Sequence, residues 1–327
     1  MVGCAVAFLA VALADVDFQG AGVGSTEPEL EAFMANETRL CQMEHARAAV
    51  AAVPMSRRML WRRADTIAAG YPSHLQQYVR LLALSLTGSL DLSPKYPMEA
   101  ARRFCGLDWP TERGFTMVGL VRLRNIAQLL LSVVSEKIPG DYAEVGVWRG
   151  GTGILARGIL NELERHGSRT VHLFDAFDVK VSKYESGHRD LFAQTRPRDV
   201  IEYFKMFGVD NKGLQIHRGL FNQSLPQFYA MLNNADLKIA VLRIDGNWYD
   251  AHQDALYYLY SFVPVGGYVI FDDFAFPWVQ SAWSDFTSDQ RFTEEVVLLD
   301  ANGGYFRKTK EVQVNFRTMR EPRDCNL

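Results

Sequence analysis

The chain has 327 residues, which suggests about two domains, and its 48% hydrophobic and 22% charged content is ordinary for a globular protein. The formal net charge of −3 gives no electrostatic case for binding nucleic acid or an anionic membrane, so neither partner is expected. Four scattered cysteines form no Cys-x-x-Cys pair, which argues against a zinc site and against a disulfide framework.

Residues 1–28 are predicted to be an extension and linker that precede the folded part of the chain. The stretch "MVGCAVAFLAVALAD" has the apolar core and Ala-rich end of a secretory signal peptide, but no Lys or Arg precedes Arg39. We therefore expect a cytoplasmic protein, with a cleaved signal peptide as the alternative. An apolar run of about 14 residues is too short to cross a bilayer, so no transmembrane segment is predicted.

Residues 29–115 are predicted to form a helical N-terminal region. Helical patterning covers 29–70, and "HLQQYVRLLALSLTG" (74–88) predicts an apolar helix that Gly88 ends. We interpret the four arginines of "SRRMLWRR" as a solvated helix face, with a phosphate or partner site as the alternative. A helical extension of this kind can serve as a contact surface between subunits, so the chain is a candidate homo-oligomer.

Strands and helices are predicted to alternate in a domain that spans residues 116–315 and is followed by a tail, 316–327. The predicted strands are 141–147, 170–175, 214–218, 239–245 and 267–272, and the predicted helices are 119–137, 152–166, 199–207, 224–232 and 250–262. The segments "EEVVLLD" and "GYFRKT", on either side of Asn302-Gly303, predict an antiparallel hairpin. The expected fold is α/β, with a Rossmann-like, mostly parallel sheet that ends in this hairpin.

The two predicted strands on either side of helix 250–262 both end in acid, the first at Asp245 and the second at Asp272 and Asp273. A strand–helix–strand unit places its strands parallel, so the three carboxylates meet at the carboxyl edge, where α/β sheets bind ligands. Gathered carboxylates repel one another unless a cation or a proton joins them, and oxygen ligands suit a hard ion such as Mg²⁺. The sequence therefore predicts a metal site.

A glycine-rich turn, "YAEVGVWRGGTG" (142–153), joins the first predicted strand of this domain to a helix. Gly150 and Gly151 let the backbone approach a ligand closely, and the helix N-terminus that follows favours negative charge. The spacing is not the G-x-G-x-x-G of dinucleotide sites. Glu144 at the end of the strand suits a cation or an amine better than a pyrophosphate. The alternative is a tight turn with only a structural role.

Asp175 ends the second predicted strand, in "VHLFDAFD". An acid at this position can accept hydrogen bonds from the ribose hydroxyls of a nucleotide. The feature does not distinguish NAD from S-adenosylmethionine, and a helix N-cap is the alternative role for the side chain.

Seven segments of the chain carry a resemblance to a known family. They are "LTGSL" (86–90), "TMVGLVRLRNIAQLL" (116–130), "AEVGVWRGG" (143–151), "LFDAFD" (173–178), "RGLFNQSLP" (218–226), "LRIDGNWYDAHQDAL" (242–256) and "GGYVIFDDF" (266–274). In this order they resemble the TylF/MycF-type macrocin O-methyltransferase family. The resemblance covers residues 75–310.

The resemblance implies a class I methyltransferase fold, S-adenosylmethionine as methyl donor, and a Mg²⁺-type, metal-dependent transfer to a hydroxyl of a sugar or similar polyol. It implies that Asp245 is the catalytic base. The metal ligands that it implies are Asp245, Asp272 and Asp273. The residues that it implies for the donor site are Glu144, Gly146, Trp148, Gly150, Gly151 and Asp175.

Two departures from the family pattern leave alternatives open. Asn247 and Arg124 stand where the family usually has acids, which keeps a catalytically silent, methyltransferase-like binding protein under consideration. A nicotinamide-dependent oxidoreductase is a second alternative, weakened by the missing dinucleotide fingerprint. His252 is an alternative base, although a surface or helix-start role is favoured. The aromatic residues near the acids are candidates either for an acceptor wall or for packing: Trp248, Tyr249, Phe274, Phe276, Trp278 and Trp283.

Overall fold

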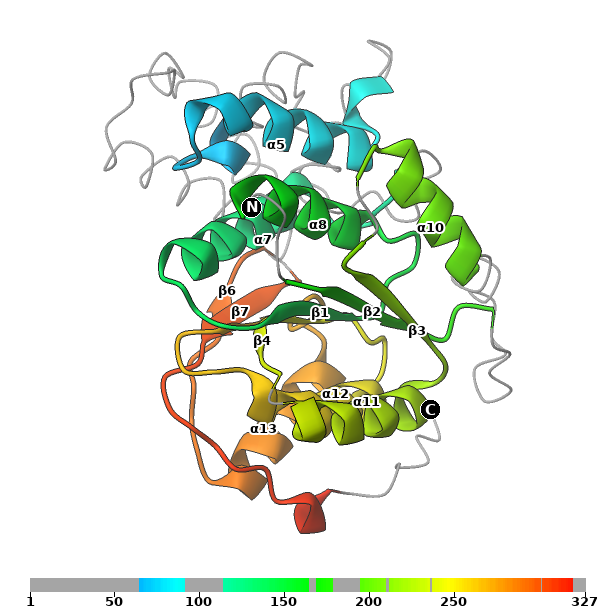
Figure 1. Ribbon diagram of the computed structural model, residues 1–327. Helices are drawn as coiled ribbons and strands as arrows, with labels where there is room; N and C mark the ends of the chain where they lie inside the picture. The colour runs from blue at the N-terminus through cyan, green and yellow to red at the C-terminus, as the bar shows by residue number, and fades with distance from the viewer. Residues whose placement is uncertain are drawn as a thin grey trace, which may run out of the picture.

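The computed structural model shows a β-sheet between two layers of helices (Figure 1). It describes residues 65–91, 114–164, 169–178, 195–209, 212–235, 237–300 and 302–319. The predicted extension 1–28, most of the helical region 29–115 with its arginine cluster, and the end of the tail therefore lie outside the described residues. Among the described helices, none is both long enough and apolar enough to span a membrane.

The sheet has seven strands in the order β3-β2-β1-β4-β5-β7-β6. The five parallel strands are β1 (Asp141–Val145), β2 (Val171–Asp175), β3 (Leu214–Arg218), β4 (Ile239–Ile244) and β5 (Tyr268–Phe271). The antiparallel hairpin consists of β6 (Val297–Leu298) and β7 (Gly304–Arg307), and β7 pairs with β5. The predicted fold class is confirmed, including the hairpin at Asn302-Gly303.

One layer covers the face of the sheet that is uppermost in Figure 1. It contains α5 (Ser73–Leu86), α7 (Leu120–Ser135), α8 (Gly151–Leu163) and α10 (Pro197–Met206), with short 3₁₀ helices η1 (Asp65–Ala68) and η2 (Ser89–Asp91). Apolar side chains from all four α-helices pack in one cluster with Tyr142, Val241 and Ile270 of the sheet. α5 therefore shares a hydrophobic core with the strands, although it lies in the region predicted as a separate N-terminal segment.

The other layer contains α11 (Phe221–Ala235), α12 (Tyr249–Leu259) and α13 (Pro277–Gln290), with η4 (Tyr260–Phe262) after α12 and η5 (Phe316–Thr318) near the end. Helix α13 is not among the predicted helices, because its aromatic residues fit a binding surface as well as a packed helix. Proline at the first helical position and buried residues at Val279, Trp283 and Phe286 explain the helix.

Alternation along the strands decides which side chains meet above the sheet. Tyr142, Val241 and Ile270 face the α7–α8 layer, whereas Ala143, Leu242 and Val269 pack with α11–α13. With a period of two residues, Glu144, Arg243, Asp245 and Asp272 follow the first set. Four charged or acidic side chains of three adjacent strands thus reach the same face at its carboxyl edge.

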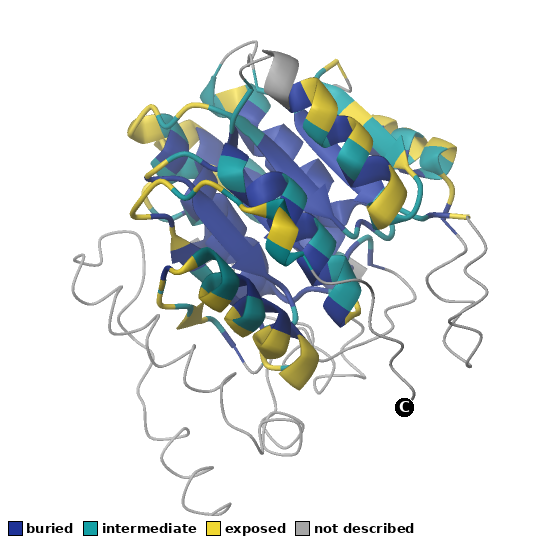
Figure 2. Cartoon of the chain, turned by 90° about the horizontal axis from the view of Figure 1, so that it is seen from below, coloured by how far each residue is buried: buried dark blue, intermediate teal, exposed yellow. Residues whose placement is uncertain are grey.

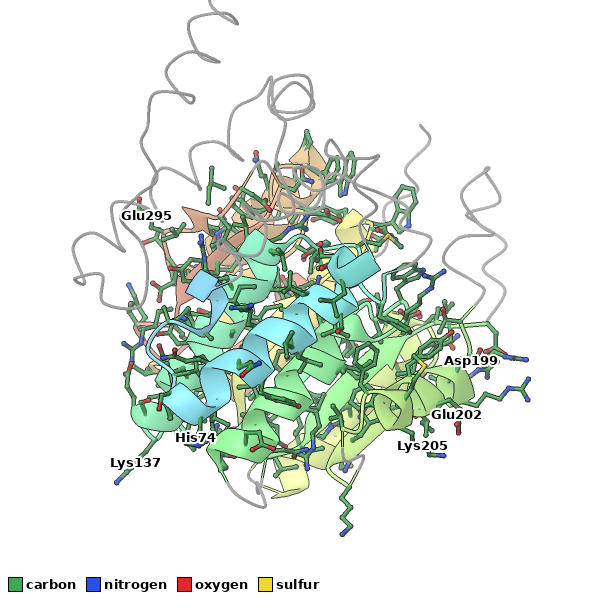
Figure 3. The ribbon with its side chains drawn as sticks, turned by 90° about the horizontal axis from the view of Figure 1, so that it is seen from above. His74, Lys137, Asp199, Glu202, Lys205 and Glu295 are labelled. Atoms are coloured by element: carbon green, nitrogen blue, oxygen red, sulfur yellow. The ribbon has the colours of Figure 1, made fainter. Side chains whose placement is uncertain are left out.

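Exposed residues lie on the outer faces of the helices, and the central strands are enclosed (Figure 2). Charged side chains such as Lys137, Glu202 and Lys205 project outward at the periphery (Figure 3). The charged groups inside the fold are therefore exceptions that need a specific explanation.

Candidate active site

The carboxyl ends of β1, β4 and β5 lie side by side because the hydrogen-bond ladder continues past the strands. The amide of Asp245 donates to the carbonyl of Val145 at 2.7 Å, and the amide of Asp272 donates to the carbonyl of Ile244 at 3.0 Å. The predicted metal ligands therefore follow directly from strands that are buried and rigidly paired. This fixes their backbones before any side-chain interaction is considered.

Arg243 is the centre of the charged cluster, and its side chain is among the largest that are fully buried. Its Nη1 donates to Glu144 at 2.9 Å, and its Nη2 donates to Asp245 at 2.8 Å and to Asp272 at 2.7 Å. One guanidinium from β4 thus binds carboxylates from the ends of β1, β4 and β5. Such charge-assisted bonds offset part of the cost of burying the ions.

Arg122 of α7 holds Asp272 from the opposite side. Its Nη1 donates to Asp272 Oδ2 at 2.6 Å, and its Nε lies 2.9 Å from Asp300 Oδ2. The other oxygen of Asp300 accepts the amides of Asn302 and Gly303 at 2.9 and 2.7 Å. The β6–β7 turn, helix α7 and the acid after β5 are therefore connected through one guanidinium.

Asp245, Asp272 and Asp273 come together as predicted. One carboxylate oxygen from each lies within 4.8 Å of the others, and no other such group of metal-binding side chains occurs among the described residues. Burial and the charge of Asp272 raise the pKa of Asp245 above its ordinary value. Burial and Asp272 also raise the pKa of Asp273 to about 6. For Asp245 and Asp273, the attraction of the nearby arginines is therefore outweighed by burial and by repulsion from Asp272.

Asp272 differs from its two neighbours. Burial raises its pKa, but the guanidiniums of Arg122 and Arg243 outweigh burial, so its pKa lies below the ordinary value. It is therefore the permanently ionised member of the group. Three carboxylates with one firmly charged member are a donor set that suits a hard divalent cation.

The glycine turn between β1 and α8 has the strained backbone expected of a close-approach site. Gly146 has φ +97°, Gly150 has φ +81° and Trp148 has φ +49°, which is unusual for a residue with a side chain. A Cβ at Gly146 would lie 2.0 Å from the carbonyl oxygen of Asp245. Glycine at this position is what allows the turn to lie directly against the proposed metal site.

The N-terminus of α8 is closed by the segment that precedes α7. The amide of Gly151 donates to the carbonyl of Phe115 at 2.9 Å, and Arg149 Nη1 donates to the carbonyl of Gly114 at 2.8 Å. A pyrophosphate in a dinucleotide fold needs the free amides at such a helix start. Since the first of these amides is engaged, the turn is better suited to a ligand without phosphate.

Asp175 lies beside this turn, at the end of β2. Its Oδ2 accepts the amides of Val147 and Trp148 at 2.7 and 3.1 Å, and its Oδ1 accepts the amide of Phe177 at 2.7 Å. The carboxylate therefore holds the strained turn in place. A contact with ribose, which the sequence predicts, would use the lone pairs that these bonds leave.

Glu144 lies beneath the turn and is fully buried. Its carboxylate accepts from Tyr142 at 2.9 Å, from Thr152 and from Arg243. Burial raises its pKa, against the opposing effect of Arg243. The side chain thus ties β1 to α8 and β4, and its predicted contact with the methyl donor stays a prediction.

Three other candidates have distinct positions in the structure. His252 is fully buried in α12, its Nδ1 lies 2.9 Å from the carbonyl oxygen of Trp248, and burial lowers its pKa to about 4. Trp283 is 7% exposed and packs in the core, so it is not part of an acceptor wall. Trp248, the N-cap of α12, is 44% exposed, and Trp278, in the first turn of α13, is 37% exposed.

The arginines that organise the site are not predicted from the sequence. Arg243 lies in the apolar run "IAVLRI", and Arg122 lies in the segment "TMVGLVRLRNIAQLL". A charge inside a fully buried strand is the signal that could have found Arg243, because such charges almost always have partners. Nothing in the local pattern indicates that Arg122 or Asp300 belongs to the same cluster.

A mostly parallel sheet that receives an antiparallel strand beside β5 defines a class I methyltransferase fold. The family model for macrocin O-methyltransferase (TylF) matches residues 68–308, and the chain belongs to this family. It is therefore an S-adenosylmethionine-dependent O-methyltransferase. The two alternatives, a silent binding protein and a nicotinamide-dependent oxidoreductase, are set aside.

The chain is similar to characterised methyltransferases over most of their length. It is 34% identical over 217 residues to demethyldecarbamoylnovobiocin O-methyltransferase of Streptomyces niveus, and this alignment covers 63% of the present chain and 79% of that enzyme. It is 30% identical over 226 residues to mycinamicin III 3''-O-methyltransferase of Micromonospora griseorubida, covering 65% and 85%. The solved O-methyltransferase NovP matches with a TM-score of 0.63 at 31% identity, covering 72% of this chain and 99% of that one.

Proposed function

We propose that the chain methylates a hydroxyl of a sugar or similar polyol on a small-molecule acceptor, and that a divalent cation such as Mg²⁺ assists. The observation that carries the proposal is the convergence of Asp245, Asp272 and Asp273 within 4.8 Å. A further relative supports a sugar acceptor by its name. It is the 8-demethyl-8-(2,3-dimethoxy-alpha-L-rhamnosyl)-tetracenomycin-C 4'-O-methyltransferase of Streptomyces olivaceus, 30% identical over 223 residues, covering 64% of this chain and 82% of that one.

The proposed donor site is the turn after β1, with Gly146, Trp148, Gly150 and Gly151 as its backbone and Asp175 beside it. The strained φ angles of the turn and its immediate contact with Asp245 support this assignment. The methyl donor carries no phosphate, which agrees with the engaged amide of Gly151. Glu144 would act from beneath, by fixing the start of α8 through Thr152.

Asp245 is the proposed base. The acceptor oxygen attacks the methyl carbon, the carbon–sulfur bond breaks, its electron pair remains on sulfur, and the hydroxyl proton passes to Asp245. Burial and Asp272 raise the pKa of Asp245 in the metal-free protein, and a bound divalent cation would favour the ionised form that accepts the proton. A divalent cation held by the three aspartates would lower the pKa of a hydroxyl bound to it and orient that group.

The acceptor is proposed to lie over the rim formed by the first turns of α12 and α13. Phe276 and Trp278 stack with ring centroids 4.6 Å apart, and Trp248 is exposed at the start of α12. Exposed apolar side chains that lie together on a protein surface can mark a binding site. Asn247, also exposed, stands between Asp245 and this rim in the sequence.

The test is isothermal titration of S-adenosylhomocysteine and of Mg²⁺ into the wild type and into Asp273→Ala. Asp273 is chosen because Asp272→Ala would remove one carboxylate partner from each of two buried guanidiniums. The expected result is unchanged binding of S-adenosylhomocysteine and loss of Mg²⁺ binding in the variant, with Glu202→Gln on the surface as the control. No Mg²⁺ binding by the wild type would refute the metal site.

The role of Asp245 is tested by Asp245→Asn in a methyl-transfer assay with a glycoside that the wild type accepts. We expect kcat to fall by about 10²-fold or more, because general-base catalysis typically contributes that much. Binding of S-adenosylhomocysteine should stay within about twofold of the wild type. Full turnover by Asp245→Asn would remove Asp245 as the base.

A further inference from the structure

The acids of the proposed metal site are held by arginines that belong to no part of the reaction described so far. Arg243 reaches them from β4 below, and Arg122 reaches them from α7. Both side chains are nearly inaccessible to solvent, at 2% and 5% exposure. Burying two guanidiniums is costly, and hydrophobic residues of similar volume often stabilise a fold equally well. The presence of both arginines therefore calls for a functional reason.

The geometry of Asp272 supplies that reason. Its Oδ1 accepts from Arg243 at 2.7 Å and its Oδ2 accepts from Arg122 at 2.6 Å, so one donor fixes each oxygen. The backbone carbonyl of Asp272 also lies 3.3 Å from Arg122 Nη1. The carboxylate cannot rotate without breaking a charge-assisted bond, and each oxygen keeps a lone pair for a cation.

Arg122 is itself fixed from behind. Asp300 forms an ion pair with its Nε at 2.9 Å, and the other oxygen of Asp300 accepts the amides of the β6–β7 turn. The stem of Arg122 lies so close to Gly303 that a Cβ there would be 2.8 Å from its Cδ. The hairpin that closes the sheet therefore sets the position of the guanidinium, and through it the position of Asp272.

We infer that Arg122 and Arg243 form a guanidinium clamp, a pair of positioning residues that holds Asp272 and Asp245 in a geometry ready for a divalent cation. The inference rests on the proposed metal site. The clamp adds positive charge next to a cation site, which by itself weakens cation binding. Its benefit is pre-organisation: ligands held by neighbouring hydrogen bonds bind metal more tightly than mobile ones.

Charge and position make opposite predictions for Arg122→Gln. If the guanidinium acts only through its charge, removing it leaves a more negative site, and Mg²⁺ binds more tightly. If it positions Asp272, Mg²⁺ binds less tightly, by about 10-fold or more, as for other residues that orient metal ligands. The sign of the change in Kd therefore separates the two roles.

Two further variants test the clamp where Arg122→Gln fails to fold. Arg122→Lys keeps the charge but loses the planar fork, and Gly303→Ala leaves every charge in place while it pushes the Arg122 stem. Arg157→Lys is the matched control, since Arg157 is also a buried arginine but donates to the carbonyl of Arg169, away from the acids. Its Mg²⁺ affinity should stay within about twofold of the wild type.

The measurement is the Kd of Mg²⁺ by isothermal titration at saturating S-adenosylhomocysteine, which needs no turnover. The Kd of S-adenosylhomocysteine, measured beside it, shows that each variant keeps its fold. Weaker Mg²⁺ binding by Arg122→Gln, Arg122→Lys and Gly303→Ala supports the clamp. Equal or tighter binding by these variants overturns it, whereas a wild type that binds no Mg²⁺ overturns the proposed metal site first.

Discussion

At the scale of single residues, the site depends on pairs that the chain brings together from distant positions. Glu144 and Arg243 are 99 residues apart, and Arg122 and Asp272 are 150 apart. Breaking an isolated buried ion pair costs about 3 to 5 kcal/mol, and the cost is smaller here because Arg243 and Arg122 each pair with more than one carboxylate. These residues therefore support both the fold and the proposed chemistry.

Gly146→Ala should abolish binding of the methyl donor. The new Cβ would lie 2.0 Å from the carbonyl oxygen of Asp245, and φ +97° is a conformation that alanine rarely adopts. The turn and the end of β4 must separate to make room, which moves both the donor site and Asp245. Titration with S-adenosylhomocysteine should show no binding under conditions that saturate the wild type.

Gly208→Ala is the control for this prediction. Gly208 also has a positive φ, +66°, but a Cβ there meets nothing within 4 Å. The free energy of unfolding of the variant should fall by only about 1 to 2 kcal/mol, which is the backbone cost of a left-handed residue with a side chain. Normal donor binding by Gly146→Ala would show that the close contact between the turn and Asp245 has no role.

At the scale of elements, the segment before α7 and the hairpin after α13 act as two supports for the site. The ring of Phe115 packs edge-on against Tyr203 in α10 and Phe207 at the end of that helix. The carbonyl of Phe115 accepts the amide of Gly151. The hairpin turn holds Arg122 through Asp300. Both segments are irregular in structure. The first supports the site through the carbonyl of Phe115, and the second supports it through the carboxylate of Asp300.

Helix α12 carries an acid whose ionisation opposes folding. Burial and the charge of Asp250, one turn earlier, raise the pKa of Asp254 to about 7. The folded state therefore favours the protonated form, and wild-type stability from this group falls as pH rises from about 4 to about 7. Asn mimics the protonated acid, so Asp254→Asn should exceed wild-type stability by up to about 4 kcal/mol above pH 7.

Urea unfolding of the wild type and Asp254→Asn at pH 5, 6, 7 and 8 measures this effect. The difference between their unfolding free energies should grow with pH up to about 7 and then level off. Glu202→Gln serves as the control, because Glu202 is 67% exposed and its pair with Lys205 is solvated. A constant difference between the two proteins across this range would contradict a buried, ionising Asp254.

At the scale of the whole molecule, the two faces of the sheet differ in the residues that they bury. Both faces of the sheet pack against an apolar core, and the face under α7 also buries the charged cluster at its carboxyl edge. The family match begins at residue 68, and α5 shares a hydrophobic core with α7 and α8. The predicted boundary between a helical region that ends at residue 115 and a domain that begins at residue 116 stays a prediction. The homo-oligomer and the cytoplasmic location also stay predictions.

Thermal unfolding should separate the methyl donor from other nucleotides. S-adenosylhomocysteine at about 100 times its Kd should stabilise the folded state by about 2.7 kcal/mol, which raises Tm by a few degrees. NAD should give no shift, because the amide of Gly151 that a pyrophosphate needs is engaged by Phe115. A shift with NAD as large as that with S-adenosylhomocysteine would contradict this reading of the turn.

The sequence by itself determined the order of strands and helices, the hairpin, the family and the meeting of three acids at one edge. These follow from local signals, since buried parallel strands read as apolar runs, and acids that end them share an edge. Helix α13 was missed because its aromatic residues fit a binding surface as well as a core.

Only the tertiary structure decided what holds those acids. Arg243, Arg122 and Asp300 lie on β4, on α7 and in the hairpin turn, and no spacing in the sequence relates them. It also decided that Glu144 and Asp175 are bound within the protein, and that Trp283 is core while Trp248 is exposed. The physical reason is that register and helix packing, which act between distant segments, determine which charges become neighbours.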